Sequence, residues 1–311
     1  MKPNTAHRPS RGSALILALL VIATLSGLAV AFADASRTEV SLAGFYRDGF
    51  RAKALAQAAH EAAVWALFAD EDFDVDGPGE AWSDFDGTGL PLSLADGAFV
   101  SGRITDESGK LNVNMLLSDE GEIDEARAEQ VRRLLEILGL DPSACDALLD
   151  WLDPDDIKRM DGAESYHYQA LEIPYLCANG PLLTPGQTRL VRGLEDGDLL
   201  PFVTIYTDGK INVNTAPAEV LQSLDEGLDR TVAEALISRR EDLPFTSLEE
   251  VGEVGGVDQE LFGRIQGFLT VKSSTYGVTL DARWGDTTAH LRSVVERDDD
   301  KGPLLLYWKV M

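Results

Sequence analysis

A long apolar stretch opens the chain. Residues 12–33 read GSALILALLVIATLSGLAVAFA, 22 residues without a charge between Arg11 and Asp34. That length spans the hydrocarbon core of a bilayer as a helix. Beyond it, an apolar stripe at every fourth position predicts that the helix continues from Ser13 to Ala69, roughly 85 Å. The stripe consists of Phe50, Ala54, Ala58, Ala62 and Ala66, with Leu55, Trp65 and Phe68 beside it.

The rest of the chain divides into strands and helices by its periodicity. Five stretches have the alternation or β-branched content of strands. They are residues 98–105, 268–273, 276–284, 289–297 and 304–310. Residues 122–152 and 216–266 have helical periodicity, and the acidic, turn-rich residues 70–97 predict a loop. The predicted fold class is α+β: a long N-terminal helix on a small antiparallel sheet, interrupted by a helical insertion of about 150 residues.

The net charge of the chain and the charges near its N-terminus restrict the functions that it can have. The chain holds 27 basic and 53 acidic residues, a formal net charge of -26, which argues against nucleic-acid binding through clustered Lys and Arg. The charges before the apolar stretch, Lys2, Arg8 and Arg11, are all basic, which orients the N-terminus to the cytoplasm and the bulk of the chain outside. A secretory signal peptide cut after Ala31–Phe32–Ala33 is the alternative.

A hexapeptide recurs 100 residues along the chain. Residues 109–114 read GKLNVN and residues 209–214 read GKINVN. Asn caps helices and forms turns, so both copies predict a strand end that leads into a cap. From the second copy onward, residues 211–248 resemble the helix-hairpin-helix module of competence-type DNA-binding proteins. Residues 205–270 hold 5 bases and 13 acids, so the charge favours this fold without DNA binding.

Taken in order, these features resemble the type II secretion system minor pseudopilin K family, also called general secretion pathway protein K, over nearly the whole chain. The resemblance is carried by a basic leader ending in Gly12, the apolar helix, SGKLNVN at 108–114, LDWLDPDD at 149–156, Gly162–Glu164, Tyr166, Tyr168, GKINVNTAP at 209–217, Pro244–Phe245 and the terminal strands. The family implies a pilin-like core with a SAM-like, helix-hairpin-helix-like insertion.

The resemblance also implies how the chain is processed and placed. Prepilin peptidase would cut between Gly12 and Ser13, and the new amine would be methylated. The implied segments are a leader (1–12), a transmembrane part (13–33), the first part of the pilin-like core (34–115), the inserted helical domain (116–266) and the terminal strands (267–311). The implied location is the Gram-negative inner membrane with a periplasmic bulk. The implied partners are the other minor pseudopilins and the major pseudopilin.

Counted from Ser13, the fifth residue is Leu17, where pilins and most pseudopilins carry Glu. A Glu in hydrocarbon is costly unless paired, and its implied partner is the N-terminal amine of the neighbouring subunit. Leu17 therefore fits a subunit at the tip of the pseudopilus, which has no subunit ahead of it. The alternative is that Leu17 is simply another lipid-facing residue.

Two acidic stretches are candidate cation sites. Residues 72–77 (DFDVDG) match the first half of an EF-hand loop, but the twelfth position is Ser83, so a solvated turn is preferred. The second stretch crowds six carboxylates together, with Trp151 and the tyrosines Tyr166 and Tyr168 to hold it against a core. They are Asp150, Asp153, Asp155, Asp156, Asp161 and Glu164. A cation would relieve their repulsion, and the family resemblance implies calcium.

The only two cysteines, Cys145 and Cys177, flank this acidic loop. In an oxidising periplasm they would either form a disulfide or stay as two buried thiols. No nucleophile motif occurs, and His167 is interpreted as a surface residue between packed tyrosines rather than a zinc ligand, so no enzyme is predicted. Two functions follow: a minor pseudopilin that initiates or caps a fibre for protein export, or a membrane-anchored helix-hairpin-helix protein for DNA binding and uptake.

Overall fold

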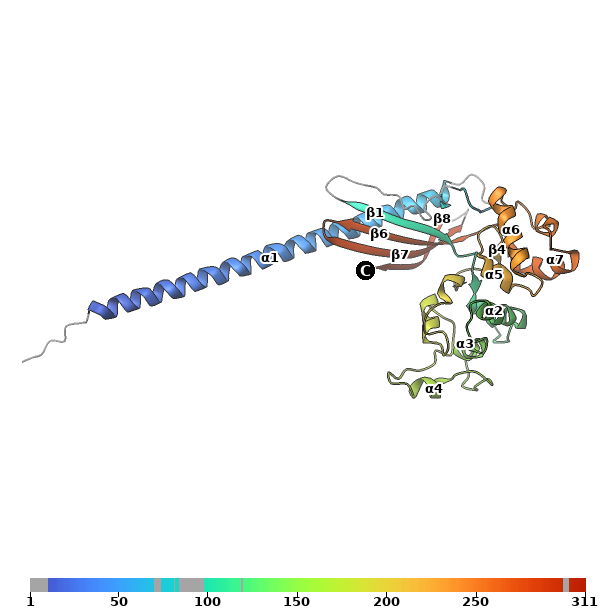
Figure 1. Ribbon diagram of the computed structural model, residues 1–311, viewed down its shortest axis with the longest axis horizontal. Coiled ribbons are helices and arrows are strands. Elements are labelled where there is room, and N and C mark those ends of the chain that lie inside the picture. The colour runs from blue at the N-terminus through green and yellow to red at the C-terminus, as the bar shows by residue number, and fades with distance from the viewer. Residues whose placement is uncertain (1–10, 70–73, 81, 84–97, 119, 299–301) are drawn as a thin grey trace, which may run out of the picture.

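One helix dominates the shape of the molecule. The computed structural model describes residues 11–69, 74–80, 82–83, 98–118, 120–298 and 302–311 (Figure 1). Helix α1 (Arg11–Phe68) runs unbroken for 58 residues, about 87 Å at 1.5 Å per residue. Its N-terminal half projects alone, and its C-terminal half lies along a sheet. The predicted continuous helix is confirmed.

The face that α1 turns to the sheet differs from the predicted stripe. The buried side chains are Ala52, Ala56, Ala59, His60, Ala63 and Leu67. The predicted Ala54, Ala58 and Ala62 are exposed, as are Phe50 and Trp65, each 75% exposed. Alanines occur on two neighbouring faces of this helix, so composition alone did not distinguish them. The stripe prediction was therefore wrong by one helix face for these exposed residues, whereas the predicted Leu55 and Phe68 are half-buried and pack against the core.

A four-stranded antiparallel sheet packs on α1. Its order is β1 (Phe99–Asp106), β6 (Thr275–Trp284), β7 (Thr287–Asp298) and β8 (Gly302–Val310). The inward side chains of β6 are Tyr276, Val278, Leu280 and Ala282, which join the alanines of α1 in one core. The predicted strand at 268–273 does not join this sheet. Only β5 (Leu269–Thr270) forms there, in a separate two-stranded ladder.

The insertion between β1 and β6 has its own core. Its first half contains β2 (Leu111–Asn112), η3 (Val113–Leu116), α2 (Glu125–Ile137), α3 (Ala144–Leu152), α4 (Ser165–Gln169), η4 (Pro185–Leu190), η5 (Leu200–Phe202) and β3 (Val203–Thr204). Its second half contains β4 (Ile211–Asn212), α5 (Ala218–Ser223), α6 (Arg230–Asp242), η6 (Glu249–Glu253), α7 (Gln259–Ile265), η7 (Gln266–Phe268) and β5. The α+β class with a helical insertion is confirmed. The helices lie at the end of the sheet farthest from the N-terminus, α5, α6 and α7 beyond it and α2, α3 and α4 to one side (Figure 1).

Both copies end a short strand in an Asn that fixes the next turn, as predicted, but only Asn112 caps a helix (η3), whereas the N-cap of α5 is Pro217. The Asn112 side chain accepts a hydrogen bond from the Asn114 backbone N–H (3.0 Å), and the Asn212 side chain accepts one from Asn214 N–H (2.9 Å). Each copy also pairs in parallel with the last strand of its own half, β2 with β3 and β4 with β5. The insertion is therefore two repeats of one plan, which we call the first repeat (109–208) and the second repeat (209–272).

Candidate functional site

The start of α1 offers a surface that is mostly apolar and carries no charge from Ser13 to Ala33. Ser13 is the third residue of the helix, and residues 1–10 of the predicted leader lie outside the described residues. All side chains from Ser13 to Ala33 are exposed, Leu17 by 61%. The helix is long and apolar enough to cross a membrane. An uncovered apolar helix of this kind requires lipid or other apolar helices around it.

The acidic loop of the first repeat connects α3 to α4 and is anchored by aromatic rings. Trp151 packs edge-on against Tyr168 at 5.2 Å between ring centroids, and Tyr168 stacks on Tyr175 at the same distance. Tyr168 is fully buried, whereas the predicted anchor Tyr166 is 90% exposed. Tyr175 takes the place that the sequence analysis gave to Tyr166, and His167 packs on Tyr168 alone. No periodic signal marked Tyr175, because it lies outside any helix.

Three of the six predicted carboxylates converge. Oxygens of Asp153, Asp155 and Glu164 all lie within 4.8 Å of one another. Both Glu164 oxygens and Asp153 Oδ1 are buried without a hydrogen-bond partner in the described part of the chain. Burial, followed by repulsion from Asp150 and Asp153, raises the pKa of Glu164 to about 7. Unsatisfied buried carboxylate oxygens at this spacing fit a hard cation, which would supply the missing positive charge.

The other three carboxylates have different surroundings. Arg159 donates to Asp150 (2.7 Å) and also to Asp153, so the fully buried Asp150 is neutralised by a cation that the sequence analysis overlooked. Asp156 accepts a hydrogen bond from Asn179 (3.2 Å), and Asp161 is exposed.

Close packing around Asp150 fixes the shape of the acidic loop. A Cβ atom at Gly162 would lie 1.8 Å from Asp150 Oδ2, so only glycine fits there. The structure thus forms an ion-sized group of three acids beside a buried ion pair that holds the loop in place, and Asp153 belongs to both.

The two cysteines are free thiols in the structure. Both are buried, and their thiols reach backbone carbonyls, Cys145 at Ala128 (3.6 Å) and Cys177 at Asp150 (3.5 Å). Burial raises the pKa of Cys145 to about 12 and that of Cys177 to about 11. Of the two alternatives, buried thiols describe this state.

The EF-hand-like stretch contains an unexpected buried acid. Asp72 lies outside the described residues, but Asp76 is fully buried and not in a solvated turn, so that interpretation was wrong at this position. Arg297 of β7 pairs with Asp76 at 2.5 Å, Ser273 N–H donates to it at 2.7 Å, and the Tyr276 hydroxyl also donates. Asp76 therefore connects the sheet to the end of the second repeat through hydrogen bonds and an ion pair.

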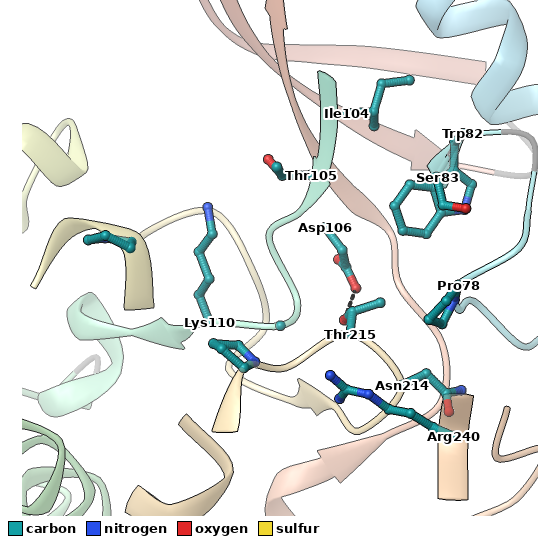
Figure 2. Close-up of a pocket in the computed structure, with 13 residues that line it drawn as sticks. Pro78, Trp82, Ser83, Ile104, Thr105, Asp106, Lys110, Asn214, Thr215 and Arg240 are labelled. Carbon is teal, nitrogen blue, oxygen red and sulfur yellow. Dashed lines mark hydrogen bonds between the residues drawn. The ribbon is translucent and has the colours of Figure 1, made fainter. Parts of the chain in front are cut away.

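A cavity of about 430 Å³ opens where the sheet meets the second repeat (Figure 2). At its wall Thr215 donates to Asp106 (2.6 Å), and burial raises the pKa of Asp106 to about 6. Arg240 donates to the carbonyls of Val213 (2.6 Å) and Ala216 (2.7 Å). These polar groups already form hydrogen bonds that hold one loop of the second repeat in place. The cavity therefore marks the junction between the sheet and the second repeat.

Comparison with known proteins identifies the family. Two family models with the description "Type II secretion system (T2SS), protein K" match residues 109–208 and 211–272, the two repeats of the insertion. Type II secretion system protein K of Pectobacterium carotovorum subsp. carotovorum is 28% identical over 312 residues, 94% of each chain. The protein of that name from Klebsiella pneumoniae is 31% identical over 227 residues, 67% of each chain.

A solved structure shares the fold. A chain in the crystal structure of the GspK-GspI-GspJ complex from the enterotoxigenic Escherichia coli type 2 secretion system superimposes with a TM-score of 0.70 at 17% sequence identity. The match covers 88% of this chain and 99% of that one. The solved structure shows the shared fold, and the two family models with these relatives show that the chain belongs to the type II secretion system protein K family of minor pseudopilins.

Proposed function

We propose that this chain is the tip subunit of the pseudopilus, where it initiates or caps the fibre that exports proteins from the periplasm. The observation that carries the proposal is the position of the insertion. The helices α5, α6 and α7 of the insertion stand beyond the far end of the sheet, on the side away from the N-terminus of α1, and α2, α3 and α4 widen the head to one side (Figure 1). A subunit stacked ahead of this one would have to occupy the same space, so the chain fits the end of a fibre better than its interior.

Leu17 supports the same position. A pilin-like subunit joins a growing fibre through a Glu at the fifth position, which pairs with the amine of the neighbouring subunit. This chain has only an exposed aliphatic side chain at that place. A first subunit does not need that pairing, and an unpaired Glu in hydrocarbon would be unfavourable.

The proposed placement includes processing by prepilin peptidase, a single pass through the inner membrane and a cytoplasmic N-terminus. Intact mass and N-terminal sequencing of the membrane-extracted protein, with and without the peptidase, test it. A mature chain that begins at methylated Ser13 is expected. A start after Ala33, or an uncut Met1, would contradict both the processing and the count that places Leu17.

The proposed partners are the other minor pseudopilins and the major pseudopilin, because a structural relative was crystallised in a complex named GspK-GspI-GspJ. The full chain, extracted in a neutral detergent with its cognate minor pseudopilins, is expected to copurify with them. In a second form, the entire apolar half of α1 is replaced by an unrelated membrane helix. If this form still copurifies with the partners, the head alone suffices to bind them. Failure of both forms to copurify would contradict the partner assignment.

We also propose that Asp153, Asp155 and Glu164 bind calcium, with the remaining acids of the loop nearby. Calcium would supply charge neutralisation and cross-link the two ends of the acidic loop. Calcium is expected to raise the melting temperature of the wild-type chain. In the Glu164→Gln variant this gain should be lost, whereas the control Glu172→Gln, an exposed acid beyond α4, should retain it. Equal gains in both variants would remove Glu164 from the site.

The proposed role is structural, without catalysis. DNA uptake is the weaker alternative, because residues 205–270, which include the helix-hairpin-helix segment, hold 13 acids against 5 bases. Mixing the full chain with labelled duplex DNA at low salt tests it, since even weak phosphate contacts strengthen there. No shift in DNA mobility is expected.

A further inference from the structure

The sheet face opposite α1 carries exposed positive charge. One cation comes from each strand: Arg103 from β1, Arg283 from β6, Arg292 from β7 and Lys309 from β8. The register places three of them in one row, because Arg103 and Arg292 both pair with Thr279, and Lys309 pairs with Arg292. We call these four residues the basic face. The row crosses all four strands, about 15 Å at the usual strand spacing.

The positive charge of the basic face is not neutralised by ion pairs within the described part of the chain. Its four cations are exposed, and none of them forms an ion pair there. Of the acids on the same side of the sheet, Asp281 is bonded to His290 (2.6 Å), and Glu296 lies toward the far end of β7. Glu107, which lines the same groove as Arg292, is paired with Lys110 (2.6 Å). Like charges directly opposite each other destabilise a sheet. In a chain with 53 acidic residues, a row of unpaired cations therefore stands out against the overall charge.

Two hollows accompany the basic face. Where β7 and β8 meet the first repeat, a groove of about 430 Å³ is lined by Arg292, Lys309 and the rings of Tyr206 and Tyr307. At the other end of the face, a hollow of about 360 Å³ surrounds Arg283. Cations beside aromatic rings in a groove are suited to carboxylate side chains carried on a polypeptide backbone.

We propose that the basic face binds an acidic segment of a partner protein. Charge complementarity selects the chemistry, since carboxylates would neutralise the unpaired row. A lipid headgroup is the less suitable source of negative charge. The sheet begins beside Gly49, where Thr287 of β7 approaches α1, and Gly49 is 16 residues or about 24 Å beyond Ala33. At physiological salt, electrostatic attraction decays over about 8 Å.

The test uses the full chain in a neutral detergent and fluorescein-labelled poly-L-glutamate as the probe. Binding is measured by fluorescence anisotropy at low and at high salt. The wild-type chain is expected to bind at low salt and to weaken as salt rises. The double variant Arg292→Glu/Lys309→Glu should weaken binding about tenfold or more, because two attractions become repulsions. The matched control Lys158→Glu/Arg230→Glu reverses two exposed cations on the insertion and should stay within about twofold.

A milder variant keeps the test decisive if the charge reversal disturbs the fold. Arg292→Gln/Lys309→Gln removes the charge only, and an intermediate loss of binding is expected. Absence of binding at low salt, or equal binding by the basic-face and control variants, would overturn the proposal. So would dependence on the basic face for phosphatidylglycerol vesicles but not for poly-L-glutamate. Self-association that the double variant abolishes, without any poly-L-glutamate binding, would instead assign the face to a second copy of the chain.

Discussion

The first and second repeats of the insertion begin alike and end differently. In each, the second Asn of the hexapeptide holds a distant backbone through two hydrogen bonds. Asn114 pairs with Leu182 at 2.9 and 3.0 Å, and Asn214 pairs with Phe245 at 2.8 and 3.0 Å. Asn114 reaches across 68 residues of sequence, but Asn214 across only 31. The same bond pattern thus encloses very different lengths of chain.

The additional length in the first repeat contains the acidic loop. In the second repeat the chain passes from the end of α6 at Asp242 to Phe245 almost directly. The second repeat is bonded to the last residue of β1, because the Asn212 amide donates to the Asp106 carboxylate (3.3 Å), and it also donates to the carbonyl of Asp76 (3.0 Å) and to Ser273 (2.7 Å). One repeated plan therefore carries two different additions, a group of three converging acids in the first repeat and the attachment to the pilin-like core in the second.

Removing the shared Asn should affect the two repeats unequally. Asn214 is fully buried and Asn114 is half-buried. Asn214→Ala would leave the Phe245 N–H and carbonyl buried without partners, at about 3 kcal/mol or more, whereas Asn114→Ala should cost about half as much. Urea unfolding of the two variants beside the wild type measures this. Equal losses would mean that the hexapeptide contributes to stability in the same way in both repeats.

The attachment of the second repeat should depend on pH through Asp106. Its pKa in the folded chain is about 6, above the usual value near 4, so the folded state holds a proton that the unfolded state releases. At low pH both states are protonated and Asp106 does not change the free energy of unfolding. As pH rises from 4 to 7, its raised pKa lowers the free energy of unfolding by about 3 kcal/mol.

Asp106→Asn isolates that contribution from the other carboxylates. Asn cannot accept from all of the donors around Asp106, so the variant should be less stable than the wild type at pH 4. The deficit should shrink by about 3 kcal/mol by pH 7, because only the wild type loses stability through this group. A deficit that is constant with pH, measured by thermal unfolding, would contradict the raised pKa.

Calcium removal should loosen the first repeat and leave the second repeat unchanged. If the acidic loop binds calcium, saturation at 100 times Kd stabilises the folded chain by about 2.7 kcal/mol. EDTA should then accelerate amide hydrogen exchange in α3, α4 and the loop between them, while α6 and α7 exchange at unchanged rates. Faster exchange in both repeats to the same degree would show that the cation acts on the whole insertion.

The features predicted correctly from the sequence have strong local patterns. The alternation in β6 and β7 and the uncharged run in α1 each occupy many residues, so single exceptions did not hide them. The ladder of β5 spans two residues, too short for periodicity to reveal that it pairs inside the insertion. The packed face of α1 was misassigned because neighbouring faces are both rich in alanine. The location of the acidic loop was evident from composition, but the pairing of Asp150 with Arg159 depends on a tertiary turn that no spacing encodes.

The smallest expected difference between the repeats concerns the turn after their first helices. Gly139 follows α2 with a left-handed φ of 71°, whereas Gly227, after α5, is not in the left-handed region. Gly139→Ala should cost about 1 kcal/mol, because a Cβ disfavours this conformation although the surrounding space is open. Gly139→Asn should recover part of the loss, since Asn tolerates a left-handed φ. Urea unfolding of both variants checks this, and an Ala variant as stable as the wild type would show that the turn can adopt another conformation without loosening the first repeat.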